Sequence, residues 1–194
     1  RIEPDHIADI SAQYDPKLES GELTAGDETD HVVHVPGRVV FVRNTGKLCF
    51  ASLQAGTNGD RIQAMLSLNE VGEQSLADWK SLVDLGDHVY VTGRVVVSRR
   101  GELSIMVREW RMAAKSIRPM PVLHKDLNEE TRVRRRYLDL MVRPEARELV
   151  KKRALITRTV RRVLEDHGYI ELETPVLQLV HGGATARPFR THLN

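Results

Sequence analysis

The sequence predicts a small β-barrel followed by a largely helical segment, and three observations predict the barrel. Five segments are rich in β-branched and aromatic residues, as strands are: residues 32–43, 48–53, 61–66, 87–98 and 102–110. Several of the stretches between them contain glycine and favour turns, at Gly46, Gly59 and Gly101. Residues 70–83, between the third and fourth segments, have apolar residues at helical spacing. Three strands, a helix and two strands in this order predict an OB-fold, a five-stranded barrel.

Residues 1–30 precede the barrel and are strongly acidic. They hold 9 acidic and 2 basic residues. One short helix is expected over residues 6–14, and the rest of this N-terminal extension is expected to be loop. The barrel domain is therefore placed at residues 31–116.

A linker and a second segment are expected after the barrel. Residues 117–127 contain Pro119 and Pro121, which favour a linker. Residues 128–194 form the second segment, which opens on the candidate helix N-cap Asn128. The apolar stripe of this first helix is predicted at Val133, Tyr137, Leu140 and Met141.

A long helix and a strand are expected next in this segment. Pro144 suits the first position of the helix, which is predicted to run to about His167. Gly168 suits the position after its end. Residues 169–173 are predicted to form a strand that stops before Pro175.

Composition excludes several classes of protein. The chain has 194 residues, a mass of 22.0 kDa and 41% apolar residues, which is enough for a packed core. No apolar run approaches the roughly 18 residues of a membrane-spanning helix. The single cysteine, Cys49, excludes an internal disulfide or a multi-cysteine zinc site.

Charge is divided unevenly along the chain. Residues 1–93 carry 7 Lys/Arg and 15 Asp/Glu, whereas residues 94–194 carry 22 and 12. Of the 29 basic residues, 22 are arginine, a side chain that binds phosphate in a bidentate manner and stacks on bases. This composition is compatible with nucleic acid or a phosphorylated ligand, although charge alone favours the simpler alternative of solvated helix faces.

Strand alternation indicates which barrel surface could bind a ligand. Successive side chains on a strand point to opposite faces, so the small apolar residues Cys49, Ala51 and Leu53 predict the interior and Phe50 points outward. In the third strand Ile62, Ala64 and Leu66 predict the interior, with Arg61, Gln63 and Met65 outside. An exposed aromatic ring beside an amide and an arginine is typical of single-stranded nucleic-acid binding. The alternative is an inverted strand with Phe50 in the core, since phenylalanine is more often buried.

Other motifs do not indicate a site. His31 and His34 are three residues apart on a predicted strand and should face opposite ways. Gly46-Lys47 lacks the pattern of a phosphate loop. His181-Gly182-Gly183 is not accompanied by Gly-x-Ser-x-Gly. The arginines from 132 to 136 are expected to form a solvated helix face.

Three stretches carry a family resemblance. VRRRYLDL (133–140), HGYIELETPVLQ (167–178) and HGGATARPFRTHLN (181–194), together with the barrel, resemble bacterial-type class II lysyl-tRNA synthetases. The first two are close to the aspartyl and asparaginyl relatives, and the third points to lysine. The resemblance implies an anticodon-binding OB domain followed by the helical and strand start of an α+β class II catalytic domain. It implies that residues 128–194 hold the first signature motif of a catalytic domain that continues beyond them.

The resemblance also assigns roles to individual residues. It implies anticodon contacts by Arg43, Phe50, Gln63 and Glu102, with Phe50 stacking on the middle base and Gln63 reading it. Gly183 matches the lysine pocket, and Pro175 matches the dimer-interface motif. No catalytic residue and no metal ligand is assigned in this chain.

The function implied is lysine–tRNA ligation, with tRNA as partner and a cytoplasmic homodimer as the assembly. ATP and Mg²⁺ would serve the full-length enzyme, at residues beyond this segment, so the segment alone is expected to be inactive and to bind neither. Two alternatives remain open. One is a stand-alone OB-fold RNA-binding module. The other is the synthetase module of a bifunctional lysyl-phosphatidylglycerol synthetase, in which case the protein would be membrane-associated through an upstream domain.

Overall fold

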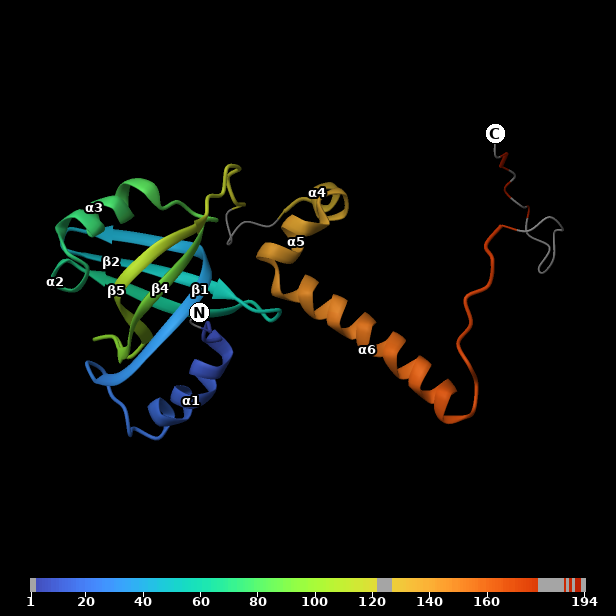
Figure 1. Cartoon of the computed structure of the whole chain (residues 1–194), viewed down its shortest axis with the longest axis horizontal. Helices are drawn as coiled ribbons and strands as arrows, with labels where there is room; N and C mark the ends of the chain where they lie inside the picture. The colour runs from blue at the N-terminus through green and yellow to red at the C-terminus, as the bar shows by residue number, and fades with distance from the viewer. Residues whose placement is uncertain (1–2, 122–126, 178–186, 188, 190, 193–194) are drawn as a thin grey trace. The chain divides into compact units, whose positions relative to one another are not determined.

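The computed structural model describes residues 3–121, 127–177, 187, 189 and 191–192 (Figure 1). The chain divides into two compact units, Arg1–Leu149 and Val150–Asn194. The first unit contains a barrel with its flanking helices, and the second contains most of a long helix and the chain that follows it. No helix in the described ranges is long and apolar enough to cross a membrane.

Five strands close the barrel in the order β1-β2-β3-β5-β4. They are β1 (Glu28–Thr45), β2 (Leu48–Ala55), β3 (Asp60–Ser67), β4 (His88–Val97) and β5 (Leu103–Ala114). All neighbours are antiparallel except β3 and β5, which run parallel. The predicted OB-fold is confirmed. The main difference is the length of β1, which begins at Glu28 because it pairs with the end of β4, where Glu28 lies opposite Val96.

The barrel interior is built from alternating apolar residues, as strand periodicity predicts. Successive side chains of a regular strand point alternately into the barrel and outward. Almost fully buried residues come from all five strands: Val33, Val35, Val39, Cys49, Ala51, Leu53, Ile62, Ala64, Leu66, Val89, Val91, Val95, Ile105 and Val107. Phe50 and Gln63 therefore lie on the outer surface, as expected.

Two helices, rather than one, connect β3 to β4. The predicted helix over residues 70–83 is divided into α2 (Leu68–Val71) and α3 (Glu73–Leu82) by Gly72, whose φ is 82°. A residue with positive φ ends one helix, and glycine adopts this conformation without a Cβ clash. α3 buries Leu76 and Trp79 against the barrel, and Trp79 meets Trp110 edge to face at 5.1 Å between centroids.

The helix α1 (Ile7–Glu19) belongs to the barrel core. It is longer than predicted and buries Ile7, Ile10 and Tyr14 in the same apolar cluster as the strands. Figure 1 shows it on the side of the barrel away from α3. Tyr14 Oη lies 2.9 Å from His31 Nδ1, whereas His34 Nδ1 lies 3.0 Å from Thr92 Oγ1. The two histidines therefore have separate partners, as expected.

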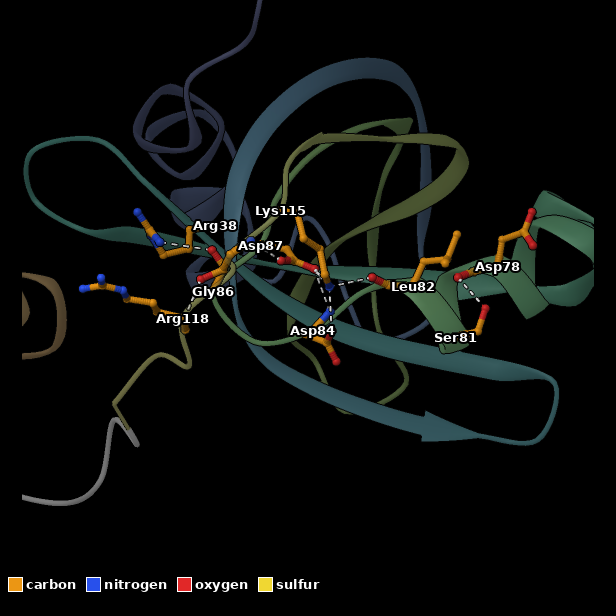
Figure 2. A network of polar contacts seen from close by, with 10 residues as sticks. Arg38, Asp78, Ser81, Leu82, Asp84, Gly86, Asp87, Lys115 and Arg118 are labelled. Carbon is orange, nitrogen blue, oxygen red and sulfur yellow. Dashed lines mark hydrogen bonds and ion pairs between the residues drawn. The ribbon is translucent and has the colours of Figure 1, made fainter.

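One buried residue, Asp87, precedes β4 and contacts both β1 and the chain that follows β5. Figure 2 shows its contact with Lys115. Asp87 is fully buried, and its Oδ2 accepts hydrogen bonds from Asp84 N at 2.8 Å and Lys115 Nζ at 2.7 Å. Its Oδ1 accepts from Ser116 N at 2.7 Å. The backbone carbonyl of Asp87 accepts from Val39 N of β1 at 2.8 Å. Three chain segments thus meet at one residue.

The helices after residue 127 differ in part from the prediction. Asn128 caps α4 (Glu129–Arg134) by accepting from Thr131 N at 2.8 Å, as predicted. The predicted apolar stripe is wrong for Val133 and Tyr137, because the first helix ends at Arg134 and a second, α5 (Arg136–Val142), follows. Val133 and Tyr137 are consequently 73% and 57% exposed. Leu140 and Met141 are half-buried.

The arginines near residue 135 surround a buried carboxylate rather than forming only a solvated face. Asp139 is 1% exposed. Its oxygens lie 2.8 Å from Arg136 Nη1, 3.2 Å from Arg143 Nη1 and 3.7 Å from Arg132 Nε. The arginines form a solvated face as predicted, since the side chains of Arg132 and Arg136 are 41% and 47% exposed. Both also supply the opposite charge that a buried carboxylate needs.

The helix α6 (Pro144–Asp166) begins at Pro144 as predicted. Gly168, with φ of 84°, follows it, and Tyr169 N donates to Leu164 O at 3.0 Å. The prediction of a strand at residues 169–173 is wrong for the described chain. These residues have no strand partner among the described residues, and a strand needs one for its backbone hydrogen bonds.

Candidate nucleic-acid interface

A groove of about 800 Å³ runs over the outer surface of the barrel. It is lined by residues of all five strands and of the turn between β4 and β5. All four residues that the sequence analysis assigns to an anticodon site line it: Arg43, Phe50, Gln63 and Glu102. The structure therefore brings these four residues, which span 60 positions of sequence, into one groove.

Arg43 and Phe50 form a flat pair at the groove surface. They are direct partners in the β1–β2 ladder. The Arg43 guanidinium carbon lies 4.5 Å from the centroid of the half-buried Phe50 ring, a cation–π arrangement. Aromatic rings and guanidinium planes at a surface are the groups on which unpaired bases stack.

Gln63 and Glu102 lie beside this pair and are hydrogen-bonded to each other. Gln63 Nε2 donates to Glu102 Oε2. Ser104 Oγ lies 3.1 Å from Gln63 Oε1 and 2.9 Å from Glu102 O, and Ser104 is fully buried opposite Gln63 in the parallel β3–β5 pairing. Because a carboxylate only accepts, Glu102 places the NH₂ group of Gln63 on its own side of the groove surface.

Further groove residues were not found from the sequence. Phe41 is 54% exposed and lines the groove together with Arg99 and Arg100 of the β4–β5 turn. The signal that could have found Arg99 and Arg100 is their place in the fold, since the loop between the fourth and fifth strands of an OB-fold commonly contacts oligonucleotides. Ser104 could not be found from the sequence because its partner Gln63 is 41 positions away.

The charged side chains at the groove favour binding of an anion. Arg43, Arg99 and Arg100 face solvent, whereas the lining acid Glu28 is paired with Arg94 at 3.2 Å. Cys49 lies on the opposite, interior face of β2, and burial raises the pKa of its thiol. The groove thus offers stacking, hydrogen bonding and positive charge.

Comparison with known proteins assigns both parts of the chain. Residues 33–113 match the family model of an OB-fold nucleic acid binding domain, and residues 128–194 match that of class II tRNA synthetases (D, K and N). A lysine–tRNA ligase of Kineococcus radiotolerans is 57% identical over 190 residues, which is 98% of this chain and 37% of that protein. The chain is a homologue of the lysine–tRNA ligases.

Other relatives agree with this assignment. A lysine–tRNA ligase of Mycobacterium tuberculosis is 55% identical over 173 residues, 89% of this chain and 34% of its own length. A lysylphosphatidylglycerol biosynthesis bifunctional protein of Mycobacterium avium is 43% identical over 173 residues, 89% of the chain and 14% of its own length. This ligase homologue thus spans about a third of the ligases it matches. The family resemblance drawn from the sequence is confirmed.

The family resemblance also names Pro175 and Gly183. Pro175 falls in the stretch after α6 that forms neither helix nor strand. Gly183 lies outside the residues that the structure describes. Within the described part of this ligase homologue, no group of three His, Cys, Asp or Glu side chains could hold a metal ion.

Proposed function

We propose that the chain binds the anticodon loop of a lysine tRNA in the barrel groove, as one part of a lysine–tRNA ligase. The observation that carries the proposal is the Arg43–Phe50 pair beside the oriented Gln63 amide, on an OB-fold whose relatives are lysine–tRNA ligases. Phe50 stacks on the middle base, Gln63 reads its edge, and Arg43 and Glu102 contact the neighbouring nucleotides. Arg99 and Arg100 hold backbone phosphate.

The enzyme to which this part belongs activates lysine with ATP and Mg²⁺ and transfers it to tRNA. The described acidic and histidine side chains do not gather into a metal site, so we assign no catalytic step and no ATP or Mg²⁺ contact to them. The proposed domain boundaries are an extension at 1–30, the barrel at 31–116, a linker at 117–127 and the start of the catalytic domain at 128–194. Gly183 would line the lysine pocket.

Its proposed assembly is a cytoplasmic homodimer, in which Pro175 belongs to the interface. The exposed apolar residues Leu155, Ile156 and Val160 of α6, which are 54–63% exposed, support burial against another surface. A module of a lysylphosphatidylglycerol-forming protein, attached to a membrane through another domain, is the second candidate. The higher identity to the ligases, 55–57% against 43%, favours the first.

Fluorescence anisotropy with a labelled lysine-tRNA anticodon stem-loop tests the proposal. Replacing Phe50 by alanine removes the stacking surface and is expected to weaken binding by about 1–3 kcal/mol. Tyr137→Ala is the matched control, because it removes an aromatic ring that is 57% exposed on α5, outside the groove. Affinity should also fall steeply with salt, since phosphate contacts release counterions.

Two results would contradict the anticodon assignment. If Phe50→Ala binds as tightly as the unaltered chain and only salt matters, the barrel binds phosphate without reading a base. If a stem-loop of unrelated anticodon sequence binds equally well, the chain is a general RNA-binding module.

A further inference from the structure

We propose that Phe41 is a second stacking surface of the groove, on which the base next to the one on Phe50 lies when the chain holds an anticodon loop. Both rings line the same groove. This inference rests on the proposed function and deepens it, because the groove then holds two neighbouring bases on two rings. Phe41 becomes a binding residue that the family resemblance does not name.

Phe41 is a large apolar side chain that the barrel leaves uncovered. It is 54% exposed, and it faces outward because the register of β1 shifts between Val39 and Phe41. A bulge of this kind re-aims a side chain, and bulges are frequent next to binding and active sites. Exposure of one apolar side chain is common and does not by itself identify a ligand. The neighbours of the ring do so.

The ring lies one step along β1 from the Arg43–Phe50 pair. Phe41 is opposite Ser52 in the β1–β2 ladder, and Arg43 is opposite Phe50. Residues two apart on a strand share a face and are separated by about 7 Å. This step is about twice the rise per nucleotide of a stacked strand. Bases on the two rings are therefore splayed apart, as unstacked bases are in RNA loops that proteins recognise.

The side chains around Phe41 leave room for a base. Outward side chains form two rows across β1, β2 and β3, which are Arg43, Phe50 and Met65 in one row and Phe41, Ser52 and Gln63 in the next. Ser52 is too small to cover the phenyl ring of its cross-strand partner, and both residues line the groove. The row of Phe41 can therefore hold a second base beside the one on Phe50.

The charges near the ring favour a nucleic acid over an apolar segment of protein. Arg43, Arg99 and Arg100 are exposed and line the groove together with Phe41. Arginine binds phosphate in a bidentate manner and stacks on bases. An aromatic ring accepts any base, because every base has a π face. Phe41 is thus expected to add affinity at the neighbouring position without selecting the base there.

The test measures binding of three anticodon stem-loops to the 194-residue chain by fluorescence anisotropy. One stem-loop carries the complete lysine anticodon, and the other two each lack the base on one side of the middle nucleotide. Phe41→Ala is expected to weaken binding of the complete stem-loop about fivefold or more. For one of the two incomplete stem-loops the effect should be less than about twofold, because the base that the ring holds is missing. For the other it should keep its full size.

Further variants separate stacking from apolar contact and from loss of structure. Phe41→Trp keeps a flat ring and should bind within about twofold of the unaltered chain, whereas Phe41→Leu keeps only apolar bulk and should bind nearly as weakly as Phe41→Ala. Leu82→Ala is the matched control, since Leu82 is 53% exposed on α3 and does not line the groove. It should leave affinity unchanged. The melting temperature of each variant should stay close to that of the unaltered chain, because both side chains are largely exposed.

The outcomes separate this inference from the function beneath it. If Phe50→Ala weakens binding of the complete stem-loop and Phe41→Ala does not, the second stacking surface is overturned and the anticodon site stands. If Phe41→Ala weakens all three stem-loops equally, the ring does not hold a neighbouring base and the inference is again overturned. If Phe41→Leu binds as tightly as the unaltered chain, the contact is not stacking. If neither Phe50→Ala nor Phe41→Ala weakens binding, the proposed function fails and the inference fails with it.

Discussion

Replacing Gly93 by alanine is expected to lower the free energy of unfolding by about 4 kcal/mol or more, which is a large part of the stability of a small domain. A Cβ at this position would lie 2.1 Å from the Met106 carbonyl oxygen and 2.9 Å from Ile105 Cγ2. The contact with the Met106 carbonyl oxygen cannot be avoided by a side-chain rotation, because that oxygen belongs to the backbone of β5. The pairing of β4 with β5 shifts register between Thr92 and Gly93, and the two strands come close at this shift.

Urea unfolding followed by circular dichroism measures this loss. Gly46→Ala is the matched control, because no atom lies within 4 Å of a Cβ built there and its φ is not positive. It should change the unfolding free energy by less than about 1 kcal/mol. If Gly93→Ala also changed the unfolding free energy by less than about 1 kcal/mol, β5 would be able to move away at little energetic cost. In that case the position of Ser104, two residues before Met106, would be looser than the groove requires.

The barrel could be predicted from the sequence because its signals are local. Alternation from Cys49 to Leu53 identifies the interior of β2, and it places Phe50 outside without knowledge of any other strand. The same reasoning places Gln63 outside on β3. Turn-forming glycines then divide the strands, so the order of elements is sufficient to predict the fold.

Phe41 is a residue whose position strand alternation does not predict. Val33, Val35 and Val39 are buried, so strict alternation would put Phe41 inside the barrel. The register instead shifts between Val39 and Phe41, Val40 is buried at 4% exposure, and Phe41 turns outward into the groove. A bulge adds one residue and reverses the face of every residue after it. No local pattern in residues 33–41 predicts that shift.

The hydrogen-bond network around Gln63 could not be predicted either, but for a different reason. Glu102 and Ser104 are 39 and 41 positions away in sequence, and they meet Gln63 only because β3 and β5 pair in parallel to close the barrel. The burial of a charged residue could not be predicted from the sequence for the same reason. Asp139 reads as part of a polar helix face in the sequence, and its burial depends on helices that break and turn at Arg135.

Replacing Asp87 by asparagine is expected to lower the free energy of unfolding by about 3 kcal/mol at neutral pH. The carboxylate is fully buried and receives hydrogen bonds from Lys115 and from the N–H groups of Asp84 and Ser116. Asparagine keeps the shape but turns an NH₂ group toward a donor, and it leaves the Lys115 ammonium without this partner. Asp84→Asn is the matched control, since Asp84 also pairs with Lys115 but is 74% exposed, and it should cost at most about 1 kcal/mol.

The effect of Asp87→Asn should depend on pH with a definite sign. Burial raises the pKa of Asp87, but the hydrogen bonds from Lys115 and the two backbone N–H groups outweigh it and hold the pKa below its ordinary value. A lowered pKa stabilises the folded chain fully above the unfolded value of about 4, and this stabilisation is lost as the pH falls through the folded value. The stability difference between the unaltered chain and Asp87→Asn should thus be constant above about pH 5 and shrink below about pH 4. Urea unfolding at pH 7, 4 and 3 measures this stability difference, and a difference that grew on acidification would contradict the lowered pKa.

Asp87 lies at the end of the barrel opposite the Glu102 turn. His88 and Ala114 pair beside Asp87, whereas Val97 and Leu103 pair at the other end of β4 and β5, next to that turn. The variant should therefore lose stability while any folded fraction keeps the RNA binding proposed for the groove.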